Sequence, residues 1–342
     1  MRYDHASGFT VAIDDPSQVG EARRAAGGVA ASVQLNETDA GKFALLVTEA
    51  ATNIAKHAGR GEVMLRSIDG RDGRAVELVA IDGGPGIRDL DRALSDGYST
   101  AGTSGAGLGA FSRLATRFDI YSSPGAGTVL AARIEVDRGR LPAIPVARGV
   151  DVGVVRAAKR GETECGDDWG IVVDETGRAT LTVADGLGHG GSAAEASRRA
   201  VEIAAEHATE PAGMIVASVH GGLRATRGAA LAVAELSSTG SSIRYAGLGN
   251  ISASIVSPGE SRSLVSHNGI AGHEMRKIQE FPYEWPPSAL LVVHSDGLSS
   301  RWELSRYPGL LLRDPSVVAG VIYRDYSRGR DDALIVVVRA AA

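Results

Sequence analysis

Two groups of residues in this 342-residue chain have types and spacing suited to phosphate chemistry. The first group combines a carboxylate and an amide with two glycine-rich stretches: Glu49, Asn53, residues 82–86 and residues 105–109. The second group follows it and places acidic residues beside glycines, at 166–167, 185–190, 296–297 and 331–332. The first combination is typical of a nucleotide site, and the second of a divalent-metal site that hydrolyses phosphoesters.

Glu49 and Asn53 are four residues apart in a segment with helical periodicity, so they share one face of the expected helix. The Asn53 amide oxygen is a suitable ligand for Mg²⁺, which prefers oxygen donors and phosphate. The Glu49 carboxylate can orient or deprotonate an attacking hydroxyl group. Taken alone, such a pair is more often a solvated polar stripe, so its meaning depends on the motifs that follow.

The two glycine-rich stretches strengthen the nucleotide interpretation. Asp82 ends an apolar strand, where its carboxylate can accept a hydrogen bond from the exocyclic amine of a base, and residues 83–86 let the backbone approach the ring. Gly105, Gly107 and Gly109 open a helix, whose first N–H groups can bind phosphate. Either stretch alone could be a turn, whereas the ordered combination predicts an ATP site.

The acidic residues of the second group lie where predicted strands meet loops. Asp185 and Asp296 each follow an apolar run and precede a glycine, and residues 331–332 immediately precede the apolar run 333–338. Carboxylates at adjacent strand ends can share a pair of hard cations, which activate water and hold phosphoryl oxygens. A single Asp-Gly pair is usually a turn, but several acidic points in this order predict a two-metal site.

The first half of the chain has the periodicity of an α+β domain. Capping residues at 36–39 precede a helix expected to run through Lys56 or His57, and its apolar residues recur at helical spacing. A second helix is expected at 108–115. Four strands are expected at 62–68, 75–81, 118–122 and 128–134. Helices on one face of a mixed sheet are the expected layering.

A domain boundary is expected near residues 137–149, where a charged turn precedes the proline-containing segment 141–145. The second domain should contain short alternating strands and two helices, 193–206 and 212–224. We therefore divide the chain into a first domain, a linker and a second domain at residues 1–137, 138–149 and 150–342.

Composition limits the possible functions and locations. A formal net charge of −5 without a long basic run argues against a nucleic-acid surface. The single Cys165 cannot form an internal disulfide, which favours a reducing cytoplasm. No apolar run approaches the roughly 20 residues that a membrane helix needs, and the N-terminus lacks a signal-peptide pattern. We expect a cytoplasmic protein that binds neither nucleic acid nor membrane.

The ordered motifs of the first half resemble the Bergerat ATP-binding fold of the GHKL superfamily, which includes histidine kinases, gyrase-type ATPases and anti-sigma serine kinases. The resemblance implies that Glu49 and Asn53 form the N-box, with Mg²⁺ on Asn53, and that Asp82 reads adenine with support from Thr128. Further ATP-binding positions that it implies are Gly84, Gly86, Gly105, Gly107, Leu108 and Gly109, with a lid at 95–105.

Residues 96–108 and 117–123 resemble a narrower group, the RsbT-type switch kinases of stressosome signalling, and the resemblance spans roughly residues 8–135. It implies that the phosphorylated group is a serine or threonine on a partner, such as a STAS-domain anti-anti-sigma or scaffold protein. His57 could be proposed as a phospho-acceptor, but a histidine near the negative end of the helix dipole explains it more simply.

The second half resembles the SpoIIE-type branch of the metal-dependent type 2C Ser/Thr phosphatases, in particular the RsbX-type enzymes. The matching motifs, within about residues 150–340, are 165–167, 183–188, 249–250, 294–298 and 331–332. The resemblance implies an αββα sandwich that holds two Mn²⁺ or Mg²⁺ ions.

The same resemblance implies a role for each acidic residue. Asp185 would bridge both metals, and Gly186 would offer its carbonyl oxygen. One metal would be ligated by Asp296 and Asp331, whereas Asp167 would bind mainly through water. Asp332 is the alternative to Asp331.

The chain departs from the larger type 2C enzymes at one position. Those enzymes have a histidine proton donor where this chain has Leu187. His189 lies two residues further on, and could either donate a proton or cap the following helix.

Two functions are compatible with these motifs. The first is a bifunctional regulator of a partner-switching pathway, which phosphorylates a STAS-domain protein with its N-terminal domain and dephosphorylates it with its C-terminal domain. The alternative is a phosphoserine phosphatase whose N-terminal domain only binds ATP or a partner. An intact Glu49 favours the first, because a domain that only binds could lose that carboxylate.

Overall fold

The computed structural model describes residues 2–3, 8–70, 73–94, 107–135, 150–237 and 241–340. The chain divides into two compact units: an N-terminal unit, Ala6–Pro142, and a C-terminal unit, Ala143–Ala342 together with Met1–His5. The linker and the lid expected at 138–149 and 95–105 lie outside the described residues. No helix among the described residues is both long and apolar enough to cross a membrane.

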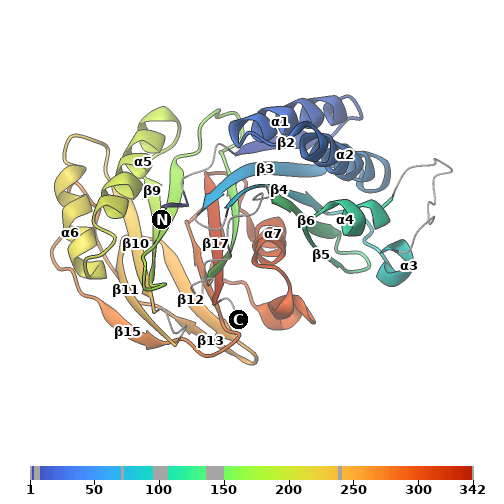
Figure 1. The fold of residues 1–342 in the computed structure, drawn as a ribbon. Coiled ribbons are helices and arrows are strands. Elements are labelled where there is room, and N and C mark those ends of the chain that lie inside the picture. Colours follow the sequence, from blue (N-terminus) through green and yellow to red (C-terminus); the bar gives the residue numbers. More distant parts are fainter. Residues whose placement is uncertain are drawn as a thin grey trace. The chain divides into compact units, whose positions relative to one another are not determined.

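The N-terminal unit is a five-stranded sheet with helices along one face (Figure 1). The order of its strands is β2 (Phe9–Ile13), β3 (Gly61–Gly70), β4 (Gly73–Asp82), β6 (Thr128–Glu135) and β5 (Arg117–Ser122). Its helices are α1 (Gln18–Ser32), α2 (Glu37–Asn53), α3 (Leu90–Leu94) and α4 (Gly109–Leu114). The expected helices and strands of this half are confirmed, while β2, α1 and α3 were not predicted.

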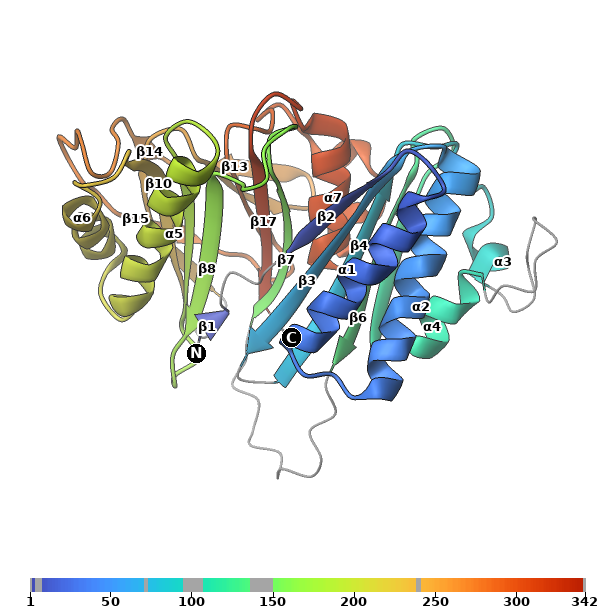
Figure 2. The ribbon, with the colours of Figure 1, turned by 90° about the horizontal axis from the view of Figure 1, so that it is seen from above.

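All strand pairs described in this sheet are antiparallel, so the expectation of a mixed sheet is wrong. Adjacent strands that are joined by a short turn, such as β3 with β4 and β5 with β6, can pair only antiparallel. Strand β6 lies between β4 and β5, and it pairs antiparallel with β4 as well. Figure 2 shows α1 and α2 side by side over this sheet, as the layering predicted.

Helix α2 begins and ends where its sequence dictates. The Asn36 side chain accepts a hydrogen bond from the Asp39 N–H at 2.9 Å, which satisfies one of the unpaired donors of the first turn. Apolar residues at helical spacing, including Phe43 and Leu46, are buried against the sheet. The helix continues as a π-helical turn, η1 (Ile54–Ala58), and stops at Gly59 in the left-handed conformation.

A buried ion triad crosses the middle of this sheet. Arg66 of β3, Glu77 of β4 and Arg133 of β6 lie in register on neighbouring strands. Both guanidinium groups bond the Glu77 carboxylate, which is 2% exposed. Burial alone would raise the pKa of Glu77, but attraction and hydrogen bonds from Arg66 and Arg133 outweigh it and lower the pKa from 4.5 to about 2.

The C-terminal unit is a sandwich of two sheets with helices on both outer faces, so the αββα expectation is confirmed. One sheet contains β1 (Arg2–Tyr3), β8 (Asp167–Val173), β9 (Ala179–Gly186), β10 (Ala229–Leu236), β11 (Ser242–Leu248), β14 (Ser266–His267) and β15 (Phe281–Glu284). The other contains β13 (Glu260–Ser263), β12 (Ser252–Ser257), β16 (Leu290–His294), β17 (Ala333–Ala340) and β7 (Val150–Ala157).

The helices of this unit cover opposite faces of the sandwich. Helices α5 (Gly191–Glu206) and α6 (Ala212–Gly222) pack on the first sheet, and α7 (Pro315–Tyr326) packs on β7 and β17 of the second (Figure 1). The first two confirm the expected helices, and α7 was not predicted. Between the sheets lies an apolar core that includes Trp169, Tyr245 and Trp285.

The start of the chain contributes to the C-terminal unit rather than to the domain expected at 1–137. Arg2 and Tyr3 form β1, which pairs antiparallel with Val172 and Ile171 of β8. The N-terminal unit is therefore inserted, in chain order, between β1 and the rest of the C-terminal unit.

We predict that Glu77→Gln lowers the free energy of unfolding by about 3–5 kcal/mol, because it leaves two guanidinium groups without their buried counter-charge. The folded-state pKa of Glu77 lies below its unfolded value, so its contribution is present above about pH 4.5 and is lost as pH falls toward about 2. Denaturant unfolding at several pH values measures both effects. The exposed Glu135 provides a control in Glu135→Gln. Equal midpoints for the two variants would contradict the prediction.

Candidate functional site

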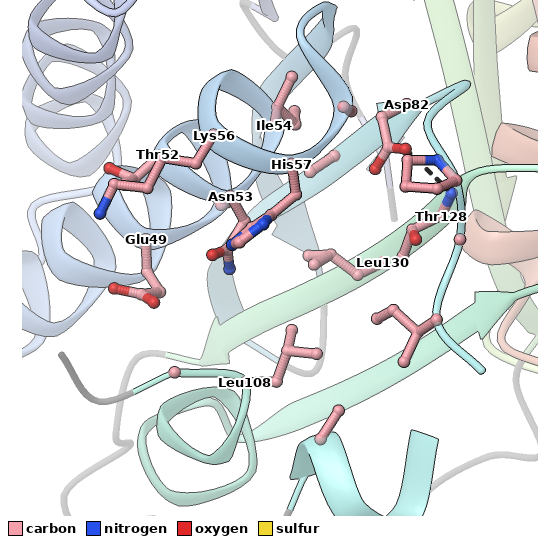
Figure 3. A pocket seen from close by; sticks show the side chains of 18 of the residues that line it. Glu49, Thr52, Asn53, Ile54, Lys56, His57, Asp82, Leu108, Thr128 and Leu130 are labelled. Carbon is pink, nitrogen blue, oxygen red and sulfur yellow. Dashed lines mark hydrogen bonds between the residues drawn. The ribbon is translucent and has the colours of Figure 1, made fainter. Parts of the chain in front are cut away.

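A cavity of about 560 Å³ lies in the N-terminal unit. It is bounded by α2 and η1, by the ends of β4 and β6, by the loop after β4 and by the start of α4 (Figure 3). The predicted ATP-site residues that line it are Glu49, Asn53, Asp82, Gly86, Gly107, Leu108 and Thr128. The structure thus gathers residues from four separate segments into one pocket.

The polar face of α2 points into this pocket. Glu49 and Asn53 are half-buried and project from the same side of the helix, and His57 extends the row from η1 (Figure 3). The π-helical turn begins immediately after Asn53. Such turns are rare inside helices and are frequent at functional sites. The pocket side of this helix therefore offers a carboxylate and an amide side by side, as Mg²⁺–nucleotide chemistry requires.

Asp82 is held at the end of β4 by backbone donors. Its Oδ1 accepts hydrogen bonds from Gly84 N at 2.8 Å and from Thr128 N at 3.3 Å. The Thr128 hydroxyl lies 2.9 Å from the Ser122 hydroxyl, which also accepts from Ile87 N. These bonds fix the carboxylate in the pocket before any ligand arrives.

Two glycines of the loop after β4 are required by close packing. A Cβ atom on Gly84 would lie 2.7 Å from the Ala58 Cβ, so this glycine lets the loop pack against η1. Gly86 has a φ of +67°, and a Cβ there would lie 2.1 Å from the Ser123 carbonyl oxygen. Gly84 shapes the pocket from behind rather than lining it, and Gly109 is buried at the first position of α4. Gly105 lies outside the described residues.

The predicted acidic residues interact electrostatically in the C-terminal unit. Asp167 at the start of β8 pairs in register with Asp185 near the end of β9. Burial, followed by the charges of Asp296, Asp331 and Asp332, raises the pKa of Asp185 from 3.8 to about 7. Burial and the Asp185 charge likewise raise the pKa of Asp167 well above its usual range. The five carboxylates therefore belong to one electrostatic cluster.

Hydrogen bonds from neighbouring groups orient these carboxylates. Ser295, which is buried, donates to Asp167 Oδ2 at 2.6 Å and accepts from Leu334 N at 3.0 Å. Asn250 donates to Asp296 Oδ2 at 2.8 Å. Sequence analysis assigned no role to Ser295 or Asn250, although both belong to the motifs 294–298 and 249–250. The available signals were that Ser295 directly precedes Asp296 and that Asn250 follows the end of β11.

The donor set fits hard divalent cations. All of its side-chain ligand atoms are carboxylate oxygens, which Mg²⁺ and Mn²⁺ prefer. Asp332 is 4% exposed, its Oδ1 accepts from Lys159 N, and its Oδ2 is buried without a hydrogen-bond partner. An unpartnered buried carboxylate oxygen is costly, and a cation would satisfy it. As the side chains stand, no group of three or more potential ligands among the described residues is converged on a single ion position.

Asp331 and Asp332 occupy different surroundings. Asp331 is exposed and accepts a hydrogen bond from the Asp332 N–H, whereas Asp332 is buried beside Gly166. A Cβ on Gly166 would lie 2.7 Å from Asp332 Oδ2, so the glycine leaves room for this carboxylate. The charges of both residues contribute to the raised pKa of Asp185.

The loop after Asp185 resolves one alternative for His189. Gly190, not His189, occupies the N-cap position of α5, and no side-chain hydrogen bond caps the helix there. The His189 Nδ1 instead lies 2.7 Å from a Glu162 carboxylate oxygen, and the imidazole is half exposed. His189 therefore does not cap the helix. Gly186 packs under the start of α5, where a Cβ would lie 2.1 Å from the Ala193 carbonyl oxygen.

We predict that Asp185→Asn stabilises the metal-free protein at pH 8 by at most about 4 kcal/mol, which is the free energy of raising a pKa from 3.8 to about 7. A raised carboxyl pKa favours the folded state at low pH, and this advantage disappears as pH rises from about 4 to about 7. Mn²⁺ should stabilise the wild type and leave the variant nearly unchanged.

Thermal unfolding in chelator and in Mn²⁺, at pH 5 and pH 8, measures these shifts. Glu303→Gln, which alters an exposed acidic residue of the same unit, is the matched control. An Asp185→Asn protein that melts like this control under all four conditions would show that Asp185 does not belong to a strained acidic cluster.

Comparisons with known proteins agree with this division into two sites. Residues 13–134 match the model of the histidine kinase-like ATPase domain, and residues 175–340 match that of Stage II sporulation protein E, SpoIIE. Over 111 residues the chain is 33% identical to the serine/threonine-protein kinase RsbT of Bacillus subtilis (strain 168). That alignment covers 32% of this chain and 84% of RsbT.

Two solved structures are similar to part of the chain. One, from work on the bacterial stressosome as a modular system adapted to control secondary messenger signalling, is 28% identical with a TM-score of 0.52, and the match covers 56% of this chain and 99% of that one. The other is RsbX in complex with magnesium, which is 22% identical with a TM-score of 0.48 over 56% of this chain and 96% of that one.

The residues that match the ATPase-domain model, 13–134, include α2 and the loop after Asp82. The SpoIIE match lies entirely in the C-terminal unit and includes Asp185, Asp296 and Asp331. The chain therefore belongs, through its N-terminal unit, to the family of the serine/threonine-protein kinase RsbT, and its C-terminal unit contains the region that matches the SpoIIE model.

Proposed function

We propose that this protein is a bifunctional regulator of a partner-switching pathway. Its N-terminal unit transfers phosphate from ATP to a serine or threonine of a STAS-domain protein, and its C-terminal unit removes that phosphate in a metal-dependent reaction. The observation that carries the proposal is the presence, in one chain, of a pocket with an intact Glu49–Asn53 face and of a buried cluster of carboxylates. The RsbT relationship supports the kinase half.

In the kinase half, each pocket residue has a separate task. Asp82 accepts a hydrogen bond from the exocyclic amine of adenine, and the Thr128 N–H holds that carboxylate in position. Asn53 offers its amide oxygen to Mg²⁺, and Gly107 with Leu108 leads into α4 beside the phosphates. Glu49 accepts the proton of the attacking serine or threonine hydroxyl.

In the phosphatase half, the carboxylates hold the reacting groups in place. When bound, a pair of Mn²⁺ or Mg²⁺ ions supplies an activated water and neutralises phosphoryl charge. Asp185 would be the ligand shared by both ions, and the Gly186 carbonyl would be a further ligand. Asp296 would bind one ion together with Asp331, or with Asp332 as the alternative, and Asp167 would act mainly through water. Ser295 and Asn250 keep two of these carboxylates oriented.

His189 is the candidate proton donor of this half. Its imidazole Nδ1 lies 2.7 Å from a Glu162 carboxylate oxygen, and the residue lies in the loop that directly follows Asp185. A metal-bound water can act as nucleophile without it, so His189→Ala should cost less activity than loss of any metal ligand.

One experiment tests both halves together. The full chain is incubated with labelled ATP, Mg²⁺ and STAS-domain proteins encoded near its gene, and Mn²⁺ is then added. Label should appear on a serine or threonine of the partner and then be lost. A protein that hydrolyses p-nitrophenyl phosphate yet labels no partner would favour the alternative, a phosphatase whose N-terminal unit only binds ATP or a partner.

For ATP binding, we predict that Asp82→Asn weakens affinity by about 1.5–3 kcal/mol, the value of a hydrogen bond to a charged group. The amide oxygen can still accept from Gly84 N and Thr128 N, so the loop should remain folded. Titration calorimetry measures the affinity. Asp91→Asn, on the exposed side of α3 and outside the pocket, is the matched control. Unchanged ATP affinity in Asp82→Asn would remove Asp82 from the adenine role.

For phosphate transfer, we predict that Glu49→Gln retains ATP binding but slows transfer roughly 10²–10⁴-fold, the usual range for a lost general base. Asn53→Ala should lose Mg²⁺-dependent ATP handling, because the amide ligand is removed. Single-turnover transfer to the labelled partner measures the first effect, and ATP binding with and without Mg²⁺ measures the second. Full-rate transfer by Glu49→Gln would exclude Glu49 as the base.

A further inference from the structure

A second cavity, of about 650 Å³, lies beside the acidic cluster of the C-terminal unit. We call it the flanking pocket. Its lining comes from the loop after β9, the first turns of α5, the loop before β10 and one residue before β15: Leu187, Gly188, Ser192, Glu195, Ala225, Thr226, Arg227 and His273. None of these residues was needed to explain metal binding.

The flanking pocket is directly continuous with the acidic site along the backbone. Leu187 and Gly188 follow Asp185 by two and three residues. The Leu187 N–H donates to the Gly228 carbonyl at 3.0 Å, immediately beyond the position where Gly186 of β9 pairs with Ala229 of β10. The loop that carries Asp185 and the loop that carries Arg227 are therefore tied together at the end of these two strands.

The guanidinium group of Arg227 lies close to that junction. A Cβ on Gly188 would lie 3.0 Å from the Arg227 Nη1, so the guanidinium rests against this glycine. The loop is fixed from the other side, because the His273 ring nitrogen Nε2 donates to the Arg227 carbonyl at 2.8 Å. The side chain is exposed, and within the described parts of the chain it forms no ion pair.

We propose that the flanking pocket binds the peptide segment next to the phosphorylated residue, and that Arg227 selects an acidic side chain in that segment. This inference rests on the proposed phosphatase function. With the phosphoryl group at Asp185, neighbouring residues of an extended substrate, each spanning about 3.3–3.6 Å, pass over Gly188 and reach the pocket. Leu187, which is 49% exposed, offers the segment an apolar contact.

The flanking pocket also contains an acidic residue, Glu195. Glu195 lies in the second turn of α5 and also lines the cavity. Its carboxylate opposes an acidic occupant, whereas Arg227 attracts one. We assign recognition to Arg227 because its guanidinium lies against the loop that leads from Asp185.

The test compares two phosphoserine peptides of identical length, one with glutamate and one with lysine on both sides of the phosphoserine. The full-length protein is assayed with Mn²⁺, and the ratio of kcat/KM for the two peptides is the readout. The wild type should prefer the acidic peptide roughly tenfold or more, as expected for a charge-assisted hydrogen bond. Arg227→Ala should abolish this preference, Arg227→Glu should reverse it, and Glu195→Gln should increase it.

Arg224→Ala is the matched control, because Arg224 is an exposed arginine of the same loop that does not line the pocket. It should keep the wild-type ratio. Retention of the acidic preference by Arg227→Ala, or equal turnover of both peptides by the wild type, would overturn the assignment of Arg227. Failure of the wild type to hydrolyse even p-nitrophenyl phosphate would instead overturn the proposed phosphatase function.

Discussion

Repulsion between carboxylates held in a partly buried site is the constraint on which the C-terminal unit is organised. Asp167 and Asp185 are forced into proximity by the register of β8 and β9, and the strand ends of the facing sheet bring Asp296, Asp331 and Asp332 to the same place. When these five carboxylates are ionised together, burial and mutual repulsion raise their free energy unless protons or cations offset the charge. The sandwich must therefore supply enough packing energy elsewhere to keep them together, and its apolar core between the two sheets provides that.

In the N-terminal unit, a polar pocket lies beside α2, a helix whose apolar face is packed against the sheet. Its sheet is stabilised on one face by the apolar contacts of α1 and α2, and across its centre by the Arg66–Glu77–Arg133 triad. The pocket lies at the end of β4, where the chain leaves the sheet through small residues that permit close backbone approach. Helices and strands thus surround the pocket, and the loop at residues 83–86 consists of glycines and a proline, whose small side chains leave space for a ligand.

Sequence reasoning succeeded where a local pattern determines the structure. The cap at Asn36 and the apolar spacing of α2 each have a local physical explanation and led to the expected helix, whereas the ligand roles of the acidic residues at strand ends stay predictions. The pairing direction of the N-terminal sheet was missed because strand order depends on which distant strands meet, and periodicity contains no such information. Helix α1 is rich in alanine and glycine, so its apolar stripe is weak.

The roles of Ser295, Asn250 and Arg227 were missed for a related reason. Each becomes visible only when residues 39 or more positions apart in the chain are brought within hydrogen-bonding or packing distance. In contrast, Asp185 was identified because its type and its strand-end position already indicate the chemistry. Residues that supply ligands are thus easier to find from sequence than residues that orient them.

The two-residue strand β1 belongs to the sheet of the C-terminal unit, although the N-terminal unit lies between it and β7 in the chain. A fragment that begins at residue 150 would lack β1 and would leave Ile171 and Val172 of β8 without their partner strand. Such bare edges template pairing with other chains. Isolating the C-terminal unit therefore calls for joining the first residues back onto β8, or for polar substitutions along that edge, rather than a simple cut at the domain boundary.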